Sequence, residues 1–343
     1  MNPPRLGFFT RLLDKASPQR RYQLAIEQIQ QAERVGFDTA WIAQHHFHEH
    51  EGGLPAPLLF LASVAAQTSR IRLGTAIITL PLEHPLRVAE DAAVLDLLAN
   101  GRLELGLGSG GTPTSFLPFS LTSEQRGAVF ARHLETMLSA FRGDTLAHAD
   151  NRLYPPAPQL ASRLWIATFS AEGAARAGAA GHGLMLSRTQ PRPASQPDLP
   201  LDALQNPIVD AYLAALPAGI EPRILASRTA FVTDSREQAR QRALPGLRQQ
   251  AQQHQALGHR LPGDNLDAWI AAFDVHLGAP EDVIASLQRD SVLRRATDIS
   301  FQVHSIDPPH AEILHSITRL ATDVAPALGW SPAASGLLTG EYA

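Results

Sequence analysis

The stretch "IRLGTAIITLPLEHPLRVAEDAAVLDLLANGRLELGLG", residues 71–108, decides the fold because it holds two strands and the helix between them. Its two ends, residues 71–80 and 102–108, are nearly continuous apolar runs, which is typical of strands buried on both faces of a parallel sheet. Between them, Pro85 opens a helical pattern that ends at Asn100 and turns Val88, Ala89, Ala92 and Leu95 inward. The stretch therefore predicts one strand–helix–strand unit.

The same alternation continues in both directions from this unit. Six more apolar runs separated by helical patterns lie at residues 5–9, 38–44, 163–169, 183–187, 224–233 and 298–304. Eight strands alternating with helices predict a closed (β/α)8 barrel, a TIM barrel, and we expect residues 1–343 to form one domain. A doubly wound open sheet is the alternative, although no GxGxxG turn follows the first strand.

Two connections are longer than ordinary barrel loops. The first, Thr189–Pro222, is rich in proline and follows strand 6; the second, Leu244–His276, is rich in glutamine and follows strand 7. We expect insertions at both places. Such insertions are typical of lids or subunit contacts, and a tolerated insertion without a role is the other interpretation.

The composition excludes several classes of protein and site. The formal net charge is −4, the basic residues are scattered, and aromatic residues make up only 6%, so we expect no nucleic-acid partner. With no cysteine, thiolate metal sites, iron–sulfur clusters and cysteine nucleophiles are excluded. We find neither a secretory signal nor a long apolar run, and therefore expect a cytoplasmic protein without a membrane partner.

Four histidines lie within "AQHHFHEH", residues 43–50, directly after the second predicted strand. In a barrel, the carboxyl ends of the strands carry the chemistry, so His45 and His46 are candidate site residues. A metal-dependent hydrolase on this fold would need further ligands, for which His182 and His304 are candidates. The fifth strand ends in "IATFS" without a ligand, so this set is incomplete and we predict no metal site. His48 and His50 are interpreted as loop residues.

Taken together, "WIAQHHFHEHEGG", "RLGT", "HPLRVAED" and "GRLELGLGSG" carry a resemblance at these spacings. The chain resembles the luciferase-like flavin monooxygenases, the family that includes bacterial luciferase. Element order and length agree along nearly the whole chain, and the family fold is a (β/α)8 barrel with insertions. The resemblance also implies a homodimer.

The resemblance implies a role for particular residues. His45 matches a histidine beside the flavin that is tied to catalysis, and His46 matches its neighbour. Ala76 and Ile77 match a non-proline cis peptide that lies against the flavin ring. Gly108 and Ser109 match the end of the fourth strand near the flavin, and Ser170 matches a phosphate-contacting serine. We add Phe169, because the fifth strand ends there, and Gly173, which would let the backbone approach the cofactor closely. The family's phosphate-binding arginine has no counterpart at the fourth strand end, so we assign that role to Arg188 after the sixth strand.

The implied activity is monooxygenation with reduced FMN, supplied by a separate flavin reductase, and molecular oxygen. A peroxyflavin would then oxidise a small organic substrate, whose identity the sequence does not reveal. One alternative is a deazaflavin-dependent oxidoreductase of the same fold that transfers hydride. Another, from a different class, is the metal-dependent TIM-barrel hydrolase. A flavin-binding protein without turnover is a further possibility.

Overall fold

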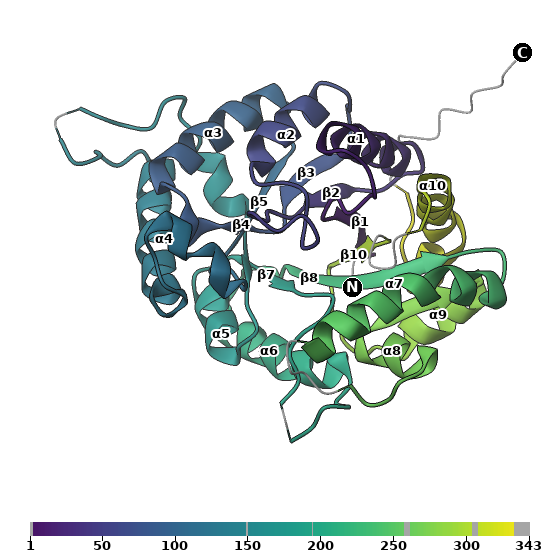
Figure 1. The fold of residues 1–343 in the computed structure, drawn as a ribbon. Helices are drawn as coiled ribbons and strands as arrows, with labels where there is room; N and C mark the ends of the chain where they lie inside the picture. Colours follow the sequence, from purple (N-terminus) through teal and green to yellow (C-terminus); the bar gives the residue numbers. More distant parts are fainter. Residues whose placement is uncertain (1–2, 149, 194, 257–260, 304–307, 333–343) are drawn as a thin grey trace, which may run out of the picture.

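Eight parallel strands close into a barrel in the computed structural model (Figure 1). The structure describes residues 3–332 except 149, 194, 257–260 and 304–307. The barrel strands are β1 (Arg5–Thr10), β2 (Thr39–Ile42), β3 (Arg72–Thr75), β5 (Leu103–Gly108), β6 (Leu164–Ala167), β7 (Gly183–Leu186), β8 (Ile224–Val232) and β10 (Asp298–Gln302). They coincide with the eight apolar runs, which confirms the predicted fold class.

Two pairings show that the sheet is closed. The first strand lies between the second and the last, since Phe8 pairs with Ala40 on one side and with Phe301 on the other. The last strand also pairs with β8, where Thr229 lies opposite Gln302. A short strand, β4 (Ile78–Thr79), continues the line of β3 and pairs with the end of β5. No open-sheet edge separates the first strand from the last, so the doubly wound alternative is wrong.

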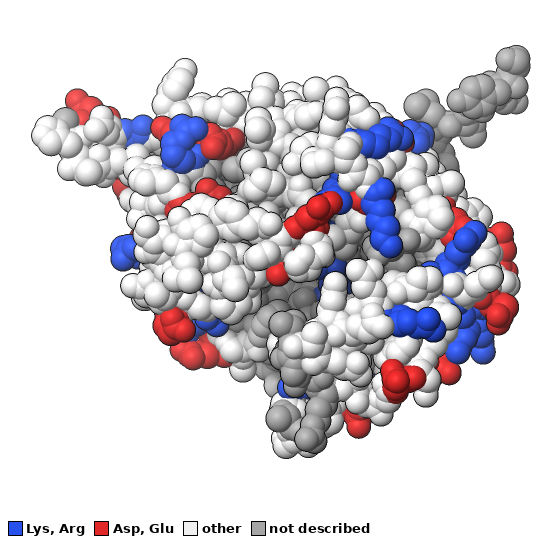
Figure 2. All heavy atoms as spheres, in the orientation of Figure 1, with Lys and Arg blue, Asp and Glu red and all other residues white. Residues whose placement is uncertain are grey.

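Helices surround the barrel as the sequence pattern predicts (Figure 1). In the described part of the chain they are α1 (Pro18–Arg34), α2 (Pro57–Ala65), α3 (Pro85–Leu98), α4 (Arg126–Arg142), α5 (Ala171–Ala179), α6 (Leu201–Ala215), α7 (Arg236–Ala256), α8 (Leu266–Ala272), α9 (Pro280–Gln288) and α10 (His310–Arg319). None of these helices is long and apolar enough to cross a membrane. On the face shown in Figure 2, acidic and basic side chains are interspersed among uncharged ones.

Two indole rings fill the barrel interior. Trp41 on β2 and Trp165 on β6 meet edge to face, with ring centroids 5.7 Å apart. A Cβ atom at Gly74 would lie well under 3.0 Å from the Trp41 ring, and one at Gly183 would lie equally close to Trp165. These glycines are therefore required by close packing. The interior is a packed core, and in barrels of this kind the ligand binds above that core, at the carboxyl ends of the strands.

The charged residues of two quoted motifs have structural partners. Arg72 of "RLGT" donates to Glu104 of "GRLELGLG" at 2.7 Å, and Trp165 donates to the same carboxylate at 2.8 Å. The buried guanidinium of Arg102 donates to backbone carbonyls of Ala65, Thr68, Ile71 and Ala99. Because these contacts satisfy buried polar groups, the motifs stabilise the fold.

The insertion after strand 7 differs from the expected long loop. In residues 244–276, α7 continues through Pro245 and is followed by α8 and by the start of β9 (Val275–Gly278). β9 pairs with the C-terminal half of β8, where Phe231 lies opposite Leu277. The glutamines and alanines of this stretch are good helix formers, and they extend the helix instead of forming a loop. In the insertion after strand 6, residues 201–215 form α6.

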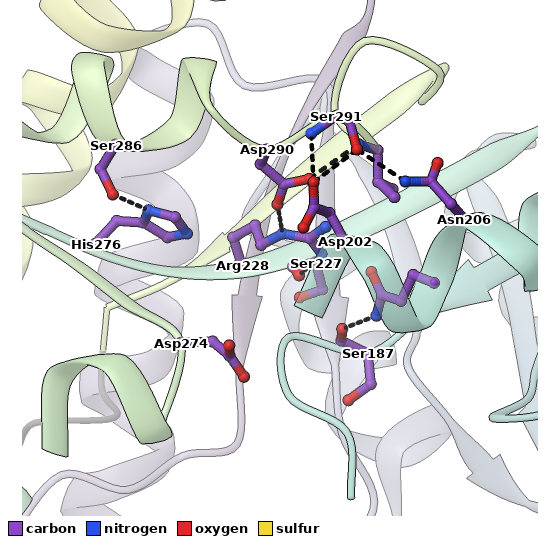
Figure 3. A network of polar contacts seen from close by, with 12 residues as sticks. Ser187, Asp202, Asn206, Ser227, Arg228, Asp274, His276, Ser286, Asp290 and Ser291 are labelled. Carbon is purple, nitrogen blue, oxygen red and sulfur yellow. Dashed lines mark hydrogen bonds and ion pairs between the residues drawn. The ribbon is translucent and has the colours of Figure 1, made fainter. Parts of the chain in front are cut away.

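A network of polar contacts attaches α6 to the barrel wall (Figure 3). The fully buried Arg228 of β8 donates to Asp290 at 2.6 Å. The hydroxyl and backbone N–H of the next residue, Ser291, both donate to Asp202 of α6, and Asn206 donates to the same hydroxyl. The inserted helix is thus fixed to the segment that follows α9. A cavity of about 770 Å³ lies beside this network, between α8, α9 and the start of α6.

Candidate active site

The carboxyl ends of five strands bring most of the predicted site residues to one end of the barrel. His45 and His46 follow β2, Ala76 and Ile77 join β3 to β4, and the other predicted residues follow β5, β6 and β7. A cavity of about 180 Å³ opens there, lined by Ala43, Gln44, His45, His46, Ala76, Ile77, Thr79, Leu82, Gly110, Gly111, Thr112, Ser115 and Phe116. Four of the predicted residues therefore share one cavity: both histidines and the Ala76–Ile77 pair.

The peptide between Ala76 and Ile77 is cis, which confirms the expectation from the resemblance. Two backbone hydrogen bonds hold this segment against the end of β2: Ala76 donates to Ile42 at 2.7 Å, and Gln44 donates to the Ile77 carbonyl at 3.3 Å. A Cβ atom at Gly108 would lie 2.9 Å from Ile77 Cδ1, so the glycine allows β5 to approach this segment closely. The floor of the cavity is consequently built from backbone and small side chains.

His45 is a half-buried imidazole on the cavity wall. Its Nδ1 lies 3.8 Å from Oε2 of Glu51, an ion-pair distance that is longer than a hydrogen bond. Burial lowers the pKa of His45, the positive charges of Arg11 and Arg188 lower it further, and Glu51 opposes them. Burial and the two arginines thus favour the neutral ring, and Glu51 favours the protonated one; these charged groups come from three strand ends. Glu51 was not among the site residues predicted from the sequence.

His46 has an aromatic environment. It meets the ring of Phe119 edge to face at a centroid distance of 5.0 Å, and Phe47 lies 5.8 Å away from both rings. Its Nε2 is buried without a hydrogen-bond partner among the described residues, and burial lowers its pKa. Phe47 has a left-handed backbone, with φ of 65°, and exposes 62% of its surface at the cavity rim. The catalytic role of His46 stays a prediction.

The start of α5 forms a compact turn in which the backbone N–H groups of Ser170 and Gly173 donate to side-chain hydroxyls. The side chain of Ser170 caps this helix by accepting a 3.1 Å hydrogen bond from the N–H of Gly173. A Cβ atom at Gly173 would collide with the hydroxyl of Thr168, so glycine is required here. Phe169, the residue before the cap, exposes half of its surface. Glu172 forms an ion pair with Arg176 on the exposed side of the helix, which counters its negative charge near this helix start.

Ser109 and Arg188 complete the predicted phosphate contacts. Ser109 is half-buried directly after β5. No residue in the described part of the chain forms a hydrogen bond or an ion pair with Arg188. At longer range, the charge of Arg11 lowers its pKa and that of Asp274 raises it. Burial lowers the pKa of this guanidinium, which therefore gains from an anionic partner. The joint site of Ser109, Ser170 and Arg188 stays a prediction.

The candidate metal ligands do not assemble. His182 precedes β7, so it lies at the opposite end of the barrel from His45, and its Nε2 is buried without a partner among the described residues. His304 lies outside the described residues. Of the two loop histidines, His50 is exposed, and Nε2 of His48 contacts the Thr114 hydroxyl at 3.1 Å. Within the ranges the structure describes, there is no group of three or more side chains that could hold a metal ion.

Comparisons with known proteins agree with this geometry. A family model described as luciferase-like monooxygenase matches residues 7–296. An uncharacterised protein of Sinorhizobium fredii is 37% identical over 171 residues, which cover 48% of each chain. The oxygenase component of a flavin-dependent trigonelline monooxygenase from Acinetobacter baylyi is 35% identical over 100 residues, or 29% of this chain and 28% of that protein. These matches span at most about half the length of the relatives.

Solved structures match almost the whole chain. A monooxygenase of Streptomyces bottropensis is 26% identical, with a TM-score of 0.75 and coverage of 94% of this chain and 99% of that one. The oxygenating constituent of 3,6-diketocamphane monooxygenase from Pseudomonas putida, solved with FMN, shares the fold at 18% identity, with a TM-score of 0.73 over 95% and 99%. A coenzyme F420 dependent reductase of Methanopyrus kandleri shares it at 16%, with a TM-score of 0.68 over 95% and 100%.

Proposed function

The chain belongs to the luciferase-like monooxygenase family, and from this premise we propose that it is an FMN-dependent monooxygenase that oxidises a small organic molecule. The observation that carries the proposal is the cavity in which His45 faces the backbone of Ala76 and Ile77. A flat ring system can lie against such a floor of backbone and small side chains. A proton-transfer group then lies beside it.

The residues present fit FMN. For the phosphate, the chain offers the start of α5 with Ser170, the hydroxyl of Ser109 and the guanidinium of Arg188, which has no partner among the described residues. For the ring, it offers Ala76 and Ile77 after β3, Gly108 at the end of β5, and Phe169 after β6, the strand that pairs with β5. When bound and reduced, FMN supplies two electrons to molecular oxygen, so that one oxygen atom enters the substrate and the other leaves as water.

The chain's own contribution is to place a proton and to exclude water. His45 donates a proton from Nε2 to the oxygen that leaves as water, and takes one back from solvent between turnovers. His46 and Phe116 line the same cavity, and we assign to these rings the exclusion of water from the reacting atoms. We assign His46 to the catalytic pair because it follows His45 directly and lines the same cavity.

Two alternatives are weaker on specific grounds. Hydride transfer with a deazaflavin is supported by the shared fold of the coenzyme F420 dependent reductase. The relatives that align in sequence favour a flavin and monooxygenation over hydride transfer, because one is named a flavin-dependent monooxygenase. A metal-dependent hydrolase lacks a ligand set among the described residues.

Two partners are part of the proposal. Reduced FMN requires a separate flavin reductase. We also propose a homodimer, for which the outward leucines of neighbouring helices α2 and α3 offer a surface: Leu59, Leu97 and Leu98 each expose 60% or more of their area.

The deciding experiment is a titration of the apoprotein with oxidised FMN, reduced FMN and reduced coenzyme F420, followed by fluorescence. Tighter binding of reduced FMN than of coenzyme F420, together with oxygen uptake, supports the proposal. Selective binding of coenzyme F420 would replace it with hydride transfer, and stoichiometric zinc or iron without flavin binding would favour the hydrolase.

A further inference from the structure

Glu51 is held beside His45 by contacts from another strand end. Its Oε2 lies 3.8 Å from Nδ1 of His45, and the same oxygen accepts a 2.8 Å hydrogen bond from the hydroxyl of Thr112, which follows β5. The carbonyl of Glu51 accepts a 3.1 Å hydrogen bond from Arg11, which follows β1. Both the carboxylate and the backbone of Glu51 are thus anchored at points outside its own loop.

The imidazole itself is confined on a second side. A Cβ atom at Gly52 would lie 2.8 Å from Cγ of His45 and closer still to Cδ2, so only a glycine lets the loop press against this ring edge. The backbone N–H of His45 donates to Leu54 at 2.9 Å. With Nδ1 toward Glu51 and the Cδ2 edge against Gly52, the ring has little freedom to flip. Nε2 has no hydrogen-bond partner within the described residues.

The negative charge of Glu51 also stabilises the protonated form of His45. The other charged or titratable groups that act on the ring or lie next to it are Arg11, Arg188 and His46, and the two arginines disfavour an imidazolium. The contacts of Glu51 with His45 and Thr112 lower the pKa of its carboxyl group to about 2, so it is ionised in every buffer in which the protein would be assayed. A permanent negative charge therefore faces Nδ1.

From this geometry we propose that Glu51 is the positioning residue of His45: it keeps a proton on Nδ1 and thereby leaves Nε2 as the atom that exchanges a proton with the cavity. Donation from Nε2 of the imidazolium leaves the neutral ring with its remaining proton on Nδ1, facing the carboxylate. The use made of that proton rests on the proposed monooxygenase function, whereas the pairing of Glu51 with His45 does not.

The test uses the full-length apoprotein and nitrogen–proton correlation NMR of the His45 ring across a pH titration. We expect the parent to show the Nδ1–H tautomer. Glu51→Gln should give mixed tautomers and lower the titration midpoint by about one pH unit, since the imidazolium loses its counter-charge. Glu51→Asp should restore part of the Nδ1–H population and part of the lost titration midpoint. Thr112→Val removes only the hydrogen bond that holds the Glu51 carboxylate. It should change the tautomer ratio and the midpoint in the same direction as Glu51→Gln, but by less.

A matched control lies in the same loop. Glu49 forms an ion pair with Arg21 rather than with His45, and its side chain is 75% exposed, so Glu49→Gln should leave the His45 titration unchanged. An unchanged tautomer and midpoint in both Glu51→Gln and Thr112→Val would overturn the inference, whatever the activity of either protein.

Activity provides the second readout. In the FMN-loaded protein, Glu51→Gln should lower kcat at least tenfold with little change in KM, and its pH profile should shift with the NMR midpoint. A pH profile that stays in place while the NMR midpoint moves would overturn the positioning role. A parent that binds no FMN but shows the coupled titration would contradict the proposed function while supporting the pairing of Glu51 with His45.

Discussion

The side-chain oxygen of Gln44 accepts a hydrogen bond from the backbone N–H of Thr79 at 2.7 Å. The amide nitrogen of the same residue donates to Glu83 at 2.6 Å and to the carbonyl of Pro55 at 3.0 Å. Gln44 and Thr79 are both buried. The residue that precedes His45 is therefore bound directly to the segment that carries the cis peptide, and one amide group links two walls of the cavity.

Replacing this amide should destabilise the protein. Gln44→Leu leaves the N–H of Thr79 and the carboxyl of Glu83 without their partner, and a buried unpaired polar group costs about 1–3 kcal/mol. We expect a loss of that size in the free energy of unfolding, measured with urea. Gln23→Leu removes an exposed glutamine of α1 and should change the free energy of unfolding by less than about 0.5 kcal/mol. Equal losses in both variants would contradict the special role of Gln44.

Ser170→Ala should weaken FMN binding by about 0.5–1.5 kcal/mol, the range of one hydrogen bond, or by more if the contact is charge-assisted. Because Ser170 also caps α5, the control is Ser17→Ala, which removes the same kind of cap from α1. Isothermal titration with FMN should show the weakening only in the Ser170 variant. The same dissociation constant in parent and Ser170→Ala would remove this residue from the phosphate site.

His45→Ala should reduce oxygenation by roughly a hundred- to ten-thousand-fold, the range for a general acid–base group. FMN affinity and melting temperature should stay close to those of the parent, and reduced flavin should be consumed with release of hydrogen peroxide instead of product. His48→Ala is the control within the same loop. Product yield and peroxide are measured together, and an unfolded His45→Ala protein would favour a structural role for this histidine.

His276 should make the protein sensitive to acid. Burial, with the charge of Arg228 added, lowers its pKa to about 4, and its Nδ1 lies 2.8 Å from the Ser286 hydroxyl (Figure 3). Between about pH 6.5, the ordinary pKa of histidine, and about pH 4, His276 binds a proton in the unfolded chain but not in the folded chain. Stability is therefore lost as the pH falls from about 6.5 to about 4 and then levels off.

His276→Asn removes this titrating group. Between pH 7 and pH 4, the parent should lose roughly 1–3 kcal/mol of unfolding free energy more than the variant does. Urea unfolding of both proteins at pH 7, 5.5 and 4 measures the difference. Parallel pH dependences would show that His276 is protonated as readily in the folded chain as in the unfolded one.

Leu97→Lys should dissociate the proposed homodimer. Leu97 and Leu98 lie on the outward face of α3, and a lysine in their midst would bury an unpaired charge in the interface. Light scattering after size-exclusion chromatography should give twice the 37.0 kDa chain mass for the parent and one chain for the variant. Leu213→Lys, on the exposed side of α6, should leave the mass unchanged. A monomeric parent would contradict the proposal outright.

Local sequence patterns were sufficient to predict the barrel. A strand buried on both faces is a run of apolar residues, and a barrel helix begins at a signal such as Ser17 or Pro85, so each element can be recognised from its own residues. The strand at 275–278 was missed because "VHLG" is short and carries a histidine that faces a polar network instead of solvent. Nothing local distinguishes it from a loop.

The sequence by itself determined the eight-stranded order of elements, the density of histidines after the second strand and, through its resemblance, the cis peptide at Ala76–Ile77. Only the tertiary structure decided which side chains meet: Glu51 with Thr112, and Gln44 with Thr79 and Glu83. The partners in these contacts lie 35 to 61 residues apart in the chain. The physical reason is that closing the barrel brings separate strand ends to one rim, while a pattern within one element carries no information about the residues across that rim.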